Sequence, residues 1–316
     1  MARASITSTP EGFDFETADL ARLSPKIRLW RGLKEAAWEL WRNRLASIGA
    51  AMVIILFLVA IFAPVLATHN PVKQNYREML QTPSEAHYFG TDKFGRDIWS
   101  RTVWGARRLV IIAVLAVCLG MLGGIPLGAI SGYFGGKLDA VLMRVVDAWL
   151  AFPGILFYLL AASFIRAYEL SLFWNTVGLI VALGAARMPS MARLVRGSVL
   201  AEREKEYVEA SHVIGESHLY IVFRQILPNC LSPVIIQATI ALGFELLIIT
   251  SLSFLGLGAP PPTPDWGADL NLAREHMVTR PYLAIFPGLA ISYAVLGFNL
   301  FGDGLRDMLD PRIADR

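Results

Sequence analysis

The stretch LVIIAVLAVCLGMLGGIPLGAISG, residues 109–132, decides the fold class of this chain, because it contains no charged residue. About 18 or more apolar residues in a row are long enough to cross the hydrocarbon core of a membrane as a helix. Gly120, Gly124, Gly128 and Gly132 are spaced four apart within it. On a helix they form one smooth ridge, which predicts close packing against a neighbouring helix. A surface along which two helices slide is the alternative interpretation.

Five further apolar stretches lie on either side of this one. Hydrophobic residues make up 55% of the 316 residues and charged residues 17%, whereas soluble domains carry about 25% charged residues. The net charge of +3 gives no indication of a nucleic-acid partner. We therefore predict an all-α, polytopic membrane protein with about six transmembrane helices, or five if the short fourth stretch is not a span. The five stretches are residues 45–67, 141–164, 174–186, 231–255 and 283–301.

Basic residues near the ends of the spans predict the orientation of the chain. Lys and Arg concentrate before the first span, between the fourth and fifth spans, and in the tail. Because cytoplasmic segments carry the excess of Lys and Arg, both termini are expected in the cytoplasm. The core is expected to lie in the lipid bilayer. The expected parts are an N-terminal extension (1–44) with an amphipathic interfacial helix (26–44), a first transmembrane helix (45–68), an external loop (69–106), a core (107–305) with a cytoplasmic loop (187–228), and a cytoplasmic tail (306–316).

Three residues inside the expected spans are unusual. A carboxylate such as Glu245 is costly among apolar residues, so it should face a partner, a cavity or the protein interior. Asp147 follows Arg144 by three residues, which favours an ion pair on one helix face over a proton relay. Pro153 lies within the third span, where proline removes a helix hydrogen bond and produces a kink, either static or a hinge. All three are candidates for the pathway or for a helix interface.

The loop at 187–228 is too charged to be a span, yet it has helical periodicity. We predict a helix at 204–215, a turn at Gly215, where glycine permits a left-handed backbone, and a second short helix at 217–226. Pro228 then opens the next span. This arrangement of helix, glycine turn and helix would lie on the cytoplasmic side.

The same loop resembles the EAA motif of ABC importer permeases, whose pattern is E-A-A, three residues, G, nine residues, I-x-L-P. The spacing from Glu209 to Pro228 matches, and Ser211 and Gln225 depart from the pattern in residue type. The resemblance implies a coupling helix at 204–215 that docks into a groove on an ATPase subunit and passes its movement to the spans. The residues it assigns to that coupling are Glu206, Tyr207, Glu209, Ala210, Ser211, Gly215, Leu227 and Pro228.

Four further segments resemble the dipeptide, oligopeptide and nickel branch of these permeases, and specifically the partner that carries an N-terminal extension. They are FGTDKFGRDIWSRTVWGAR (89–107), AFPG (151–154), SFLGLGAPPPTPDWG (253–267) and FGDGLRDMLDPR (301–312). The resemblance implies a type I ABC importer permease fold in a bacterial inner membrane. It also implies a second homologous permease subunit, two ABC ATPase subunits and an extracytoplasmic solute-binding protein as partners. Peptides are the expected substrates, with nickel, glutathione, sugars or opines as alternatives.

The motifs of several enzymes are absent from the sequence. There is no GxxxxGK[ST] phosphate loop, so ATP and Mg²⁺ are expected on the partner subunits and not on this chain. HExxH and GxSxG are also absent, and we predict no catalytic residue, cofactor site or metal site. An ion-coupled secondary transporter would need paired charges inside the membrane and, as a rule, internal repeats. One central Glu and no evident repeat disfavour it.

Two loops on the expected outer side also carry predictions. Asp92, Arg96 and Asp97 are close enough in sequence to form a salt-bridged turn. Trp266, after the proline-rich loop that follows the fifth span, suits an interfacial position. By resemblance both loops face the binding protein, and an equally good interpretation is that they form a scaffold.

Overall fold

The computed structural model describes residues 43–169 and 171–309, and within them the regular structure is helical apart from one bridge between Thr91 and Asp97. The amphipathic helix expected at 26–44 lies almost entirely outside these residues. The long helices are α3 (Arg44–Ile61), α5 (Ile98–Phe134), α8 (Leu172–Arg203), α12 (Leu231–Phe254) and α14 (Tyr282–Leu309). The shorter elements are α4 (Ala63–Leu66), η1 (Tyr76–Glu78), α6 (Gly136–Leu150), α7 (Gly154–Ala167), α9 (Glu206–Val213), α10 (His218–Tyr220), the π-helix η2 (Ile221–Ile226), α11 (Leu227–Asn229), α13 (Trp266–Ala273) and η3 (Arg274–His276).

The number of membrane spans agrees with the prediction of about six. The five long helices are each long and apolar enough to cross a membrane, and α6 with α7 forms a sixth if this bent pair counts as one span. The bend between them is 75°. Pro153 stands immediately before α7 and has no N–H to continue the helix from α6, so the expected kink is a complete break.

Three helices are longer than the apolar stretches that predict them. α5 begins at Ile98 instead of near 109, α8 continues to Arg203 instead of ending near 186, and α14 continues to Leu309. Hydropathy marks only the part of a helix that suits lipid, whereas backbone hydrogen bonds continue wherever no residue stops them. The Asp97 side chain accepts a hydrogen bond from the Ser100 N–H and fixes the start of α5.

The glycine ridge of α5 packs directly on α8, as the spacing predicts. A Cβ atom at Gly124 would lie 2.7 Å from Cβ of Met191, and one at Gly128 would lie 2.4 Å from the Ala192 carbonyl oxygen. These separations are shorter than any normal contact, so only glycine allows the two backbones to approach this closely. The ridge therefore serves helix packing in this conformation.

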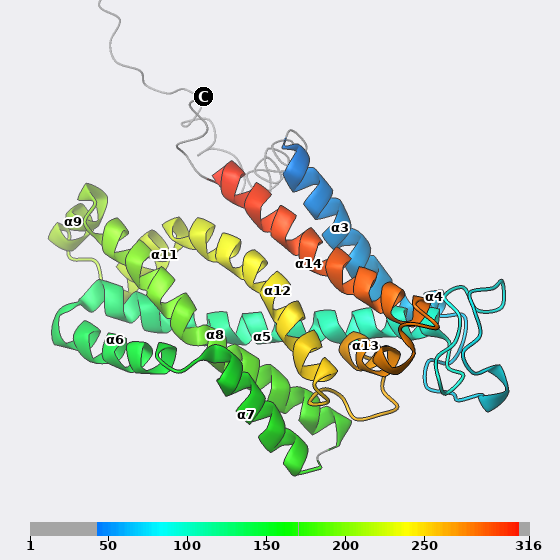
Figure 1. The fold of residues 1–316 in the computed structure, drawn as a ribbon. Coiled ribbons are helices and arrows are strands. Elements are labelled where there is room, and N and C mark those ends of the chain that lie inside the picture. The colour runs from blue at the N-terminus through cyan, green and yellow to red at the C-terminus, as the bar shows by residue number, and fades with distance from the viewer. Residues whose placement is uncertain (1–42, 170, 310–316) are drawn as a thin grey trace, which may run out of the picture.

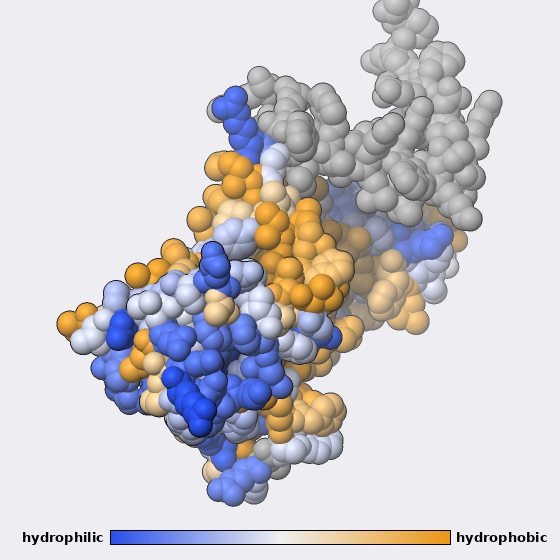
Figure 2. Space-filling view, turned by 90° about the vertical axis from the view of Figure 1, so that its right-hand side faces the viewer, coloured by the Kyte–Doolittle hydropathy of each residue, from blue (hydrophilic) through white to orange (hydrophobic). Residues whose placement is uncertain are grey.

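The two ends of the bundle carry different segments of the chain (Figure 1). One end, called here the α9 end, carries α9, α10, η2 and α11 (residues 204–229). The opposite end, called the loop end, carries residues 67–97 and 255–281, including α13. Figure 2 looks onto the loop end, where hydrophilic residues gather, while hydrophobic residues cover the flanks of the bundle. Many flank side chains are large, apolar and exposed, as on a surface that faces lipid or another membrane subunit.

Candidate coupling site

The helix expected to couple to an ATPase is α9, which follows α8 after a link of only two residues. Its first turn carries Glu206 and Glu209, which are exposed and suit the positive end of a helix dipole. Val208 is 1% exposed and packs in a core cluster with Val199, Ile221 and Ile226. One apolar side chain thus anchors α9 to the bundle, and the acidic face remains exposed.

Tyr207 connects the end of α8 with α11. Its hydroxyl donates to Oε1 of Glu202 at 2.6 Å and accepts from Nδ2 of Asn229 at 3.0 Å. Partial burial, followed by the hydrogen bond to Glu202, raises the pKa of the Tyr207 hydroxyl. The hydroxyl therefore stays protonated at neutral pH, so this link between α8 and α11 does not depend on physiological changes in pH.

Ser211 and Gln225, the two departures from the EAA pattern, contact each other. Oγ of Ser211 donates to Oε1 of Gln225 at 2.8 Å, and Nε2 of Gln225 donates to Oε2 of Glu216 at 2.5 Å. A hydrogen bond between α9 and η2 thus stands where the family pattern has two apolar residues. The substitution at one position accounts for the substitution at the other, because each polar side chain supplies the partner that the other needs when it is partly buried.

Gly215 forms the turn that the sequence predicts. Its φ is +82°, in the left-handed region, and its N–H donates to the His212 carbonyl at 3.1 Å. No atom lies within 4 Å of the position that a Cβ would occupy. Glycine is needed here for the backbone conformation and not for space.

Several aromatic and apolar side chains of this region were not predicted as site residues. Val213 and Ile214 are 82% and 74% exposed at the end of α9, and Leu219 and Phe223, in the helical segment after Gly215, are exposed as well. Adjacent exposed apolar residues on a rigid helical hairpin are typical of a protein-binding surface. Their signal in the sequence was available but ambiguous, because Val213 and Ile214 fit equally well on a buried face.

Histidines fasten the α9 end to α5. The Tyr133 hydroxyl lies 2.7 Å from Nδ1 of His218 and 3.4 Å from Nε2 of His212. A guanidinium nitrogen of Arg203 donates to the carbonyls of Gly132 and Tyr133, both at 3.0 Å. The two Arg203 hydrogen bonds satisfy carbonyls at the end of α5 that have no partner within the helix.

The remaining predicted site residues are Leu227, Pro228 and Ala210. The first two lie in the segment that Tyr207 and Ser211 contact through Asn229 and Gln225. Leu227 packs against the core cluster around Val208, and Pro228 is exposed on α11. Ala210 is exposed on α9 beside Glu209. The structure therefore assembles the motif residues around one helical hairpin at the α9 end.

Glu245 has a partner, Arg187, within the membrane-spanning part of the bundle. Nε and a terminal nitrogen of Arg187 donate to Oε1 of Glu245 at 3.0 and 2.8 Å, and the Glu245 residue is 0% exposed. The expected loop begins at residue 187, but in the structure α8 continues as a helix to Arg203, so Arg187 is helical and pairs with a residue of α12. Arg187 lies about 24 Å before the end of α8 and Glu245 about 21 Å after the start of α12, so both reach the same depth.

The predicted pairing of Asp147 with Arg144 is also wrong. Asp147 of α6 forms its ion pair with Arg193 of α8 at 2.6 Å, and both side chains are more than half exposed. The kink at Pro153 turns the chain after α6, so the face of α6 that carries Asp147 lies along α8. The interpretation as an ion pair, in preference to a proton relay, fits this contact.

The comparison with known families agrees with this geometry. Residues 124–315 match the family described as binding-protein-dependent transport system inner membrane component, and residues 32–83 match the N-terminal transmembrane domain of oligopeptide transport permease C. A chain from an inward-facing structure of the MetNI methionine ABC transporter shares the fold, with a TM-score of 0.52, 19% identity, and coverage of 66% of this chain and 97% of that chain.

Curated relatives match over nearly the full length of both chains. The chain is 41% identical over 284 residues to the dipeptide transport system permease protein DppC of Alkalihalophilus pseudofirmus, covering 90% of each. It is 39% identical over 280 residues to the glutathione transport system permease protein GsiD of Pectobacterium atrosepticum, covering 87% of this chain and 91% of that one. With this identity and coverage, and the family match over more than half of its length, the chain belongs to the binding-protein-dependent transport system inner membrane components, the permeases of ABC importers.

Proposed function

We propose that this chain forms one half of a heterodimeric pathway that imports peptides, with ATP and Mg²⁺ bound by two ATPase subunits and substrate delivered by an external binding protein. In this proposal the α9 end and both termini face the cytoplasm, and the loop end faces the binding protein. The division into an extension (1–44), a first helix (45–68), an external loop (69–106), a core (107–305) and a tail (306–316) remains a prediction.

The observation that carries the proposal is the surface of α9. Glu206, Glu209 and Ala210 are exposed together with Val213 and Ile214, while Val208 holds the helix to the core. A short rigid helix with an acidic face and an apolar end fits a groove on another protein. Within residues 43–169 and 171–309, these side chains stay exposed.

Movement of α9 would reach the membrane through two helices. Two residues separate α8 from α9, and one residue separates α11 from α12, so a displacement of α9 acts on both α8 and α12. The Arg187–Glu245 pair joins α8 to α12 deep in the bundle. A conformational change follows only if the ATPase binds the two states of α9 with different affinity, and these connected helices would supply the two states.

Peptide is the proposed substrate because the relatives named above are dipeptide and glutathione permeases. The test is uptake of a labelled dipeptide by proteoliposomes that contain this chain with its partner permease, ATPases and binding protein. We expect uptake that requires ATP and the binding protein, with glutathione, nickel and sugars measured as competitors.

Two outcomes would contradict the proposal. ATP-independent uptake driven by a proton or sodium gradient would place the chain among ion-coupled transporters, in which the Arg187–Glu245 pair would be the candidate coupling site. Uptake of nickel or a sugar without competition by peptides would leave the permease role intact and replace the substrate.

A further inference from the structure

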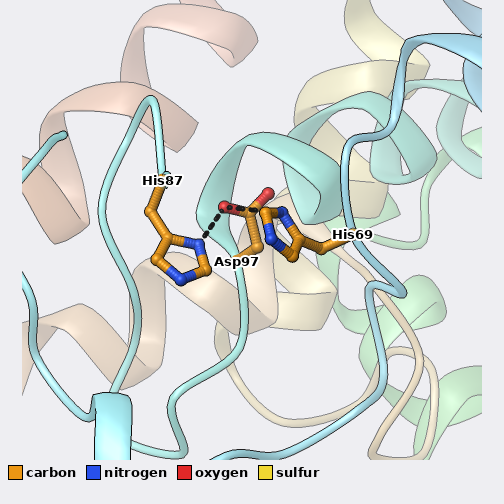
Figure 3. A group of neighbouring side chains, drawn as sticks. All are labelled: His69, His87 and Asp97. Carbon is orange, nitrogen blue, oxygen red and sulfur yellow. Dashed lines mark hydrogen bonds and ion pairs between the residues drawn. The ribbon is translucent and has the colours of Figure 1, made fainter. Parts of the chain in front are cut away.

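His69, His87 and Asp97 converge at the loop end of the bundle (Figure 3). His69 follows α4, His87 belongs to the loop before α5, and Asp97 is the N-cap of α5. One potential ligand atom from each of the three lies within 4.8 Å of the others. Among the residues that the structure describes, this is the one group of three or more His, Cys, Asp or Glu side chains with such spacing.

The two carboxylate oxygens of Asp97 have different partners. Oδ2 accepts a hydrogen bond from the backbone N–H of Ser100 at 2.8 Å, which fixes the carboxylate in the first turn of α5. Oδ1 faces the two imidazoles, 2.8 Å from Nδ1 of His87 and 3.8 Å from Nδ1 of His69. One oxygen is held by the backbone, and the other is turned toward two nitrogen donors.

The charge of Asp97 lacks the compensation that the neighbouring buried or largely buried acids receive. Asp92, Asp265 and Asp269 each pair with an arginine, at 2.6, 2.7 and 2.5 Å. Asp97 is 2% exposed, and within the described residues its ion-pair partners are the two histidines alone. A buried carboxylate is costly without a counter-charge, and the helix dipole together with one N–H supplies only part of it.

We propose that His69, His87 and Asp97 form a binding site for a divalent transition metal ion of the zinc type. Zn²⁺ takes imidazole nitrogen and carboxylate oxygen at about 2.0–2.2 Å, which places tetrahedral ligand atoms about 3.3 Å apart. The separations of 2.8 and 3.8 Å from Oδ1 lie on either side of that value. To close the geometry, His87 and Asp97 would separate by about 0.5 Å and His69, the exposed member of the set, would rotate toward them; a water molecule would complete the fourth position.

Groups around the three ligands already orient them. Oε2 of Glu78 lies 3.6 Å from Nε2 of His87, on the side of the ring away from Asp97. Metal-bound histidines usually direct the second ring nitrogen to a carboxylate, which fixes the tautomer. The backbone N–H of His69 donates to Oγ of Ser100 at 3.0 Å, so the first turn of α5 positions His69 as well as Asp97.

The site is open to solvent on the His69 side. His69 also lines a cavity of about 540 Å³ at the loop end, together with Pro71, Trp104 and Pro262. An ion can therefore enter without unfolding of the loop. Once bound, it would join the segment after α4, the loop at 84–90 and the start of α5, and would make the stability of this end depend on the metal.

The test is zinc binding by the full-length chain, purified with its partner subunits on a tag that contains no histidine and stripped with EDTA. Titration of Zn²⁺ against a chromogenic chelator should show one ion per chain that His69→Ala weakens by at least about 10-fold. Glu78→Gln, which keeps all three ligands, should weaken it by about 10-fold to 100-fold. Co²⁺ in the same site should give the visible absorption of a tetrahedral complex, which His69→Ala abolishes.

His276→Ala is the matched control, because it removes an imidazole at the same end but outside the cluster, and it should leave zinc affinity unchanged. His69→Ala and the unmodified chain should melt at the same temperature in EDTA, and only the unmodified chain should gain stability with zinc. Equal zinc affinity in the unmodified chain and His69→Ala, equal binding of Mg²⁺, or the absence of zinc binding would overturn the proposal. The proposed transport function does not depend on either outcome.

Discussion

The loop end and the α9 end are held together by different kinds of contact. At the loop end, α13 packs on α5 through Trp266, which is 3% exposed and lies against Gly105. Arg101 and Arg108 of α5 form ion pairs with Asp269 and Asp265 there. At the α9 end, the contacts between α9 and the segment after Gly215 are hydrogen bonds among partly exposed polar side chains, with Val208 as the deeply buried anchor.

This difference indicates how much free energy each end needs to change its conformation. A buried ion pair with further hydrogen bonds fixes one geometry, because breaking it leaves a charge without a partner. Hydrogen bonds between partly exposed side chains exchange with water at little net cost. We therefore expect the loop end to keep one conformation. We expect the α9 end to change its angle to the bundle when a partner binds its surface.

The largest effect should come from Arg101→Ala at the loop end. Arg101 donates to Asp269 and to the carbonyls of Pro71, Pro262 and Thr263, and its side chain is 3% exposed. Its loss should lower the free energy of unfolding by about 3–5 kcal/mol, because a buried carboxylate remains unpaired. The measurement is thermal unfolding of the purified protein in detergent.

The same variant has a predictable pH dependence. Burial raises the pKa of Asp269, and Arg101 opposes that rise. Without Arg101 the folded-state pKa lies further above the unfolded value, so the protonated form is favoured in the fold and stability falls as pH rises. Arg101→Ala should thus be more stable at mildly acidic pH than at neutral pH.

The control for this variant is Lys93→Ala, which breaks the solvent-exposed pair with Glu275 and should leave the melting temperature unchanged. A loss of stability as large as that of Arg101→Ala would remove the contrast between buried and exposed pairs.

Hydropathy and motif spacing predict much of this structure. The apolar stretches locate the spans, the glycine ridge predicts the packing of α5 on α8, and the EAA spacing predicts α9 and the Gly215 turn. Each of these signals is local, because the residues that carry it lie on one helix or within one turn. Residues 92 and 96 form the salt-bridged turn expected there for the same reason.

The sequence is less informative where a contact joins distant segments. Trp266 was expected at the membrane interface but is buried, with Nε1 donating to the Thr102 carbonyl at 2.7 Å. Asp97 was expected in the salt-bridged turn but caps α5 and meets His69 and His87. Arg187 was assigned to a loop because the charged segment was expected to end the helix, whereas charge is a poor guide to where a helix ends. Such pairings depend on tertiary packing, and neither periodicity nor residue type specifies the partner.

The next effect in size should come from Gly215→Ala at the α9 end. An L residue with φ of +82° costs about 1–2 kcal/mol, and the open space around Gly215 means that this backbone strain is the only penalty. Relief of the strain would rotate α9 relative to η2. We expect ATP-dependent peptide uptake to fall by about fivefold to thirtyfold, the factor that corresponds to that energy, while folding and membrane insertion persist.

Gly197→Ala is the matched control for this glycine. Gly197 lies in α8 with helical geometry, and no atom stands within 4 Å of its Cβ position either. Alanine there should be neutral or stabilise the helix by about 0.5–1 kcal/mol. Equal loss of uptake in both variants would show that the positive φ of Gly215 is unimportant for coupling.

The smallest effect should come from Ser211 and Gln225, and it tests how the α9 end is held. Ser211→Ala should cost about 1 kcal/mol, because Gln225 loses a donor while it remains partly buried. Ser211→Ala combined with Gln225→Ile recreates the family pattern and replaces both polar partners with apolar ones, which should be nearly neutral. A double-mutant cycle on thermal unfolding should therefore be non-additive, with the double variant more stable than Ser211→Ala alone. Additive losses would mean that the two side chains contribute independently, and the α9 end would then resemble the loop end in depending on each contact separately.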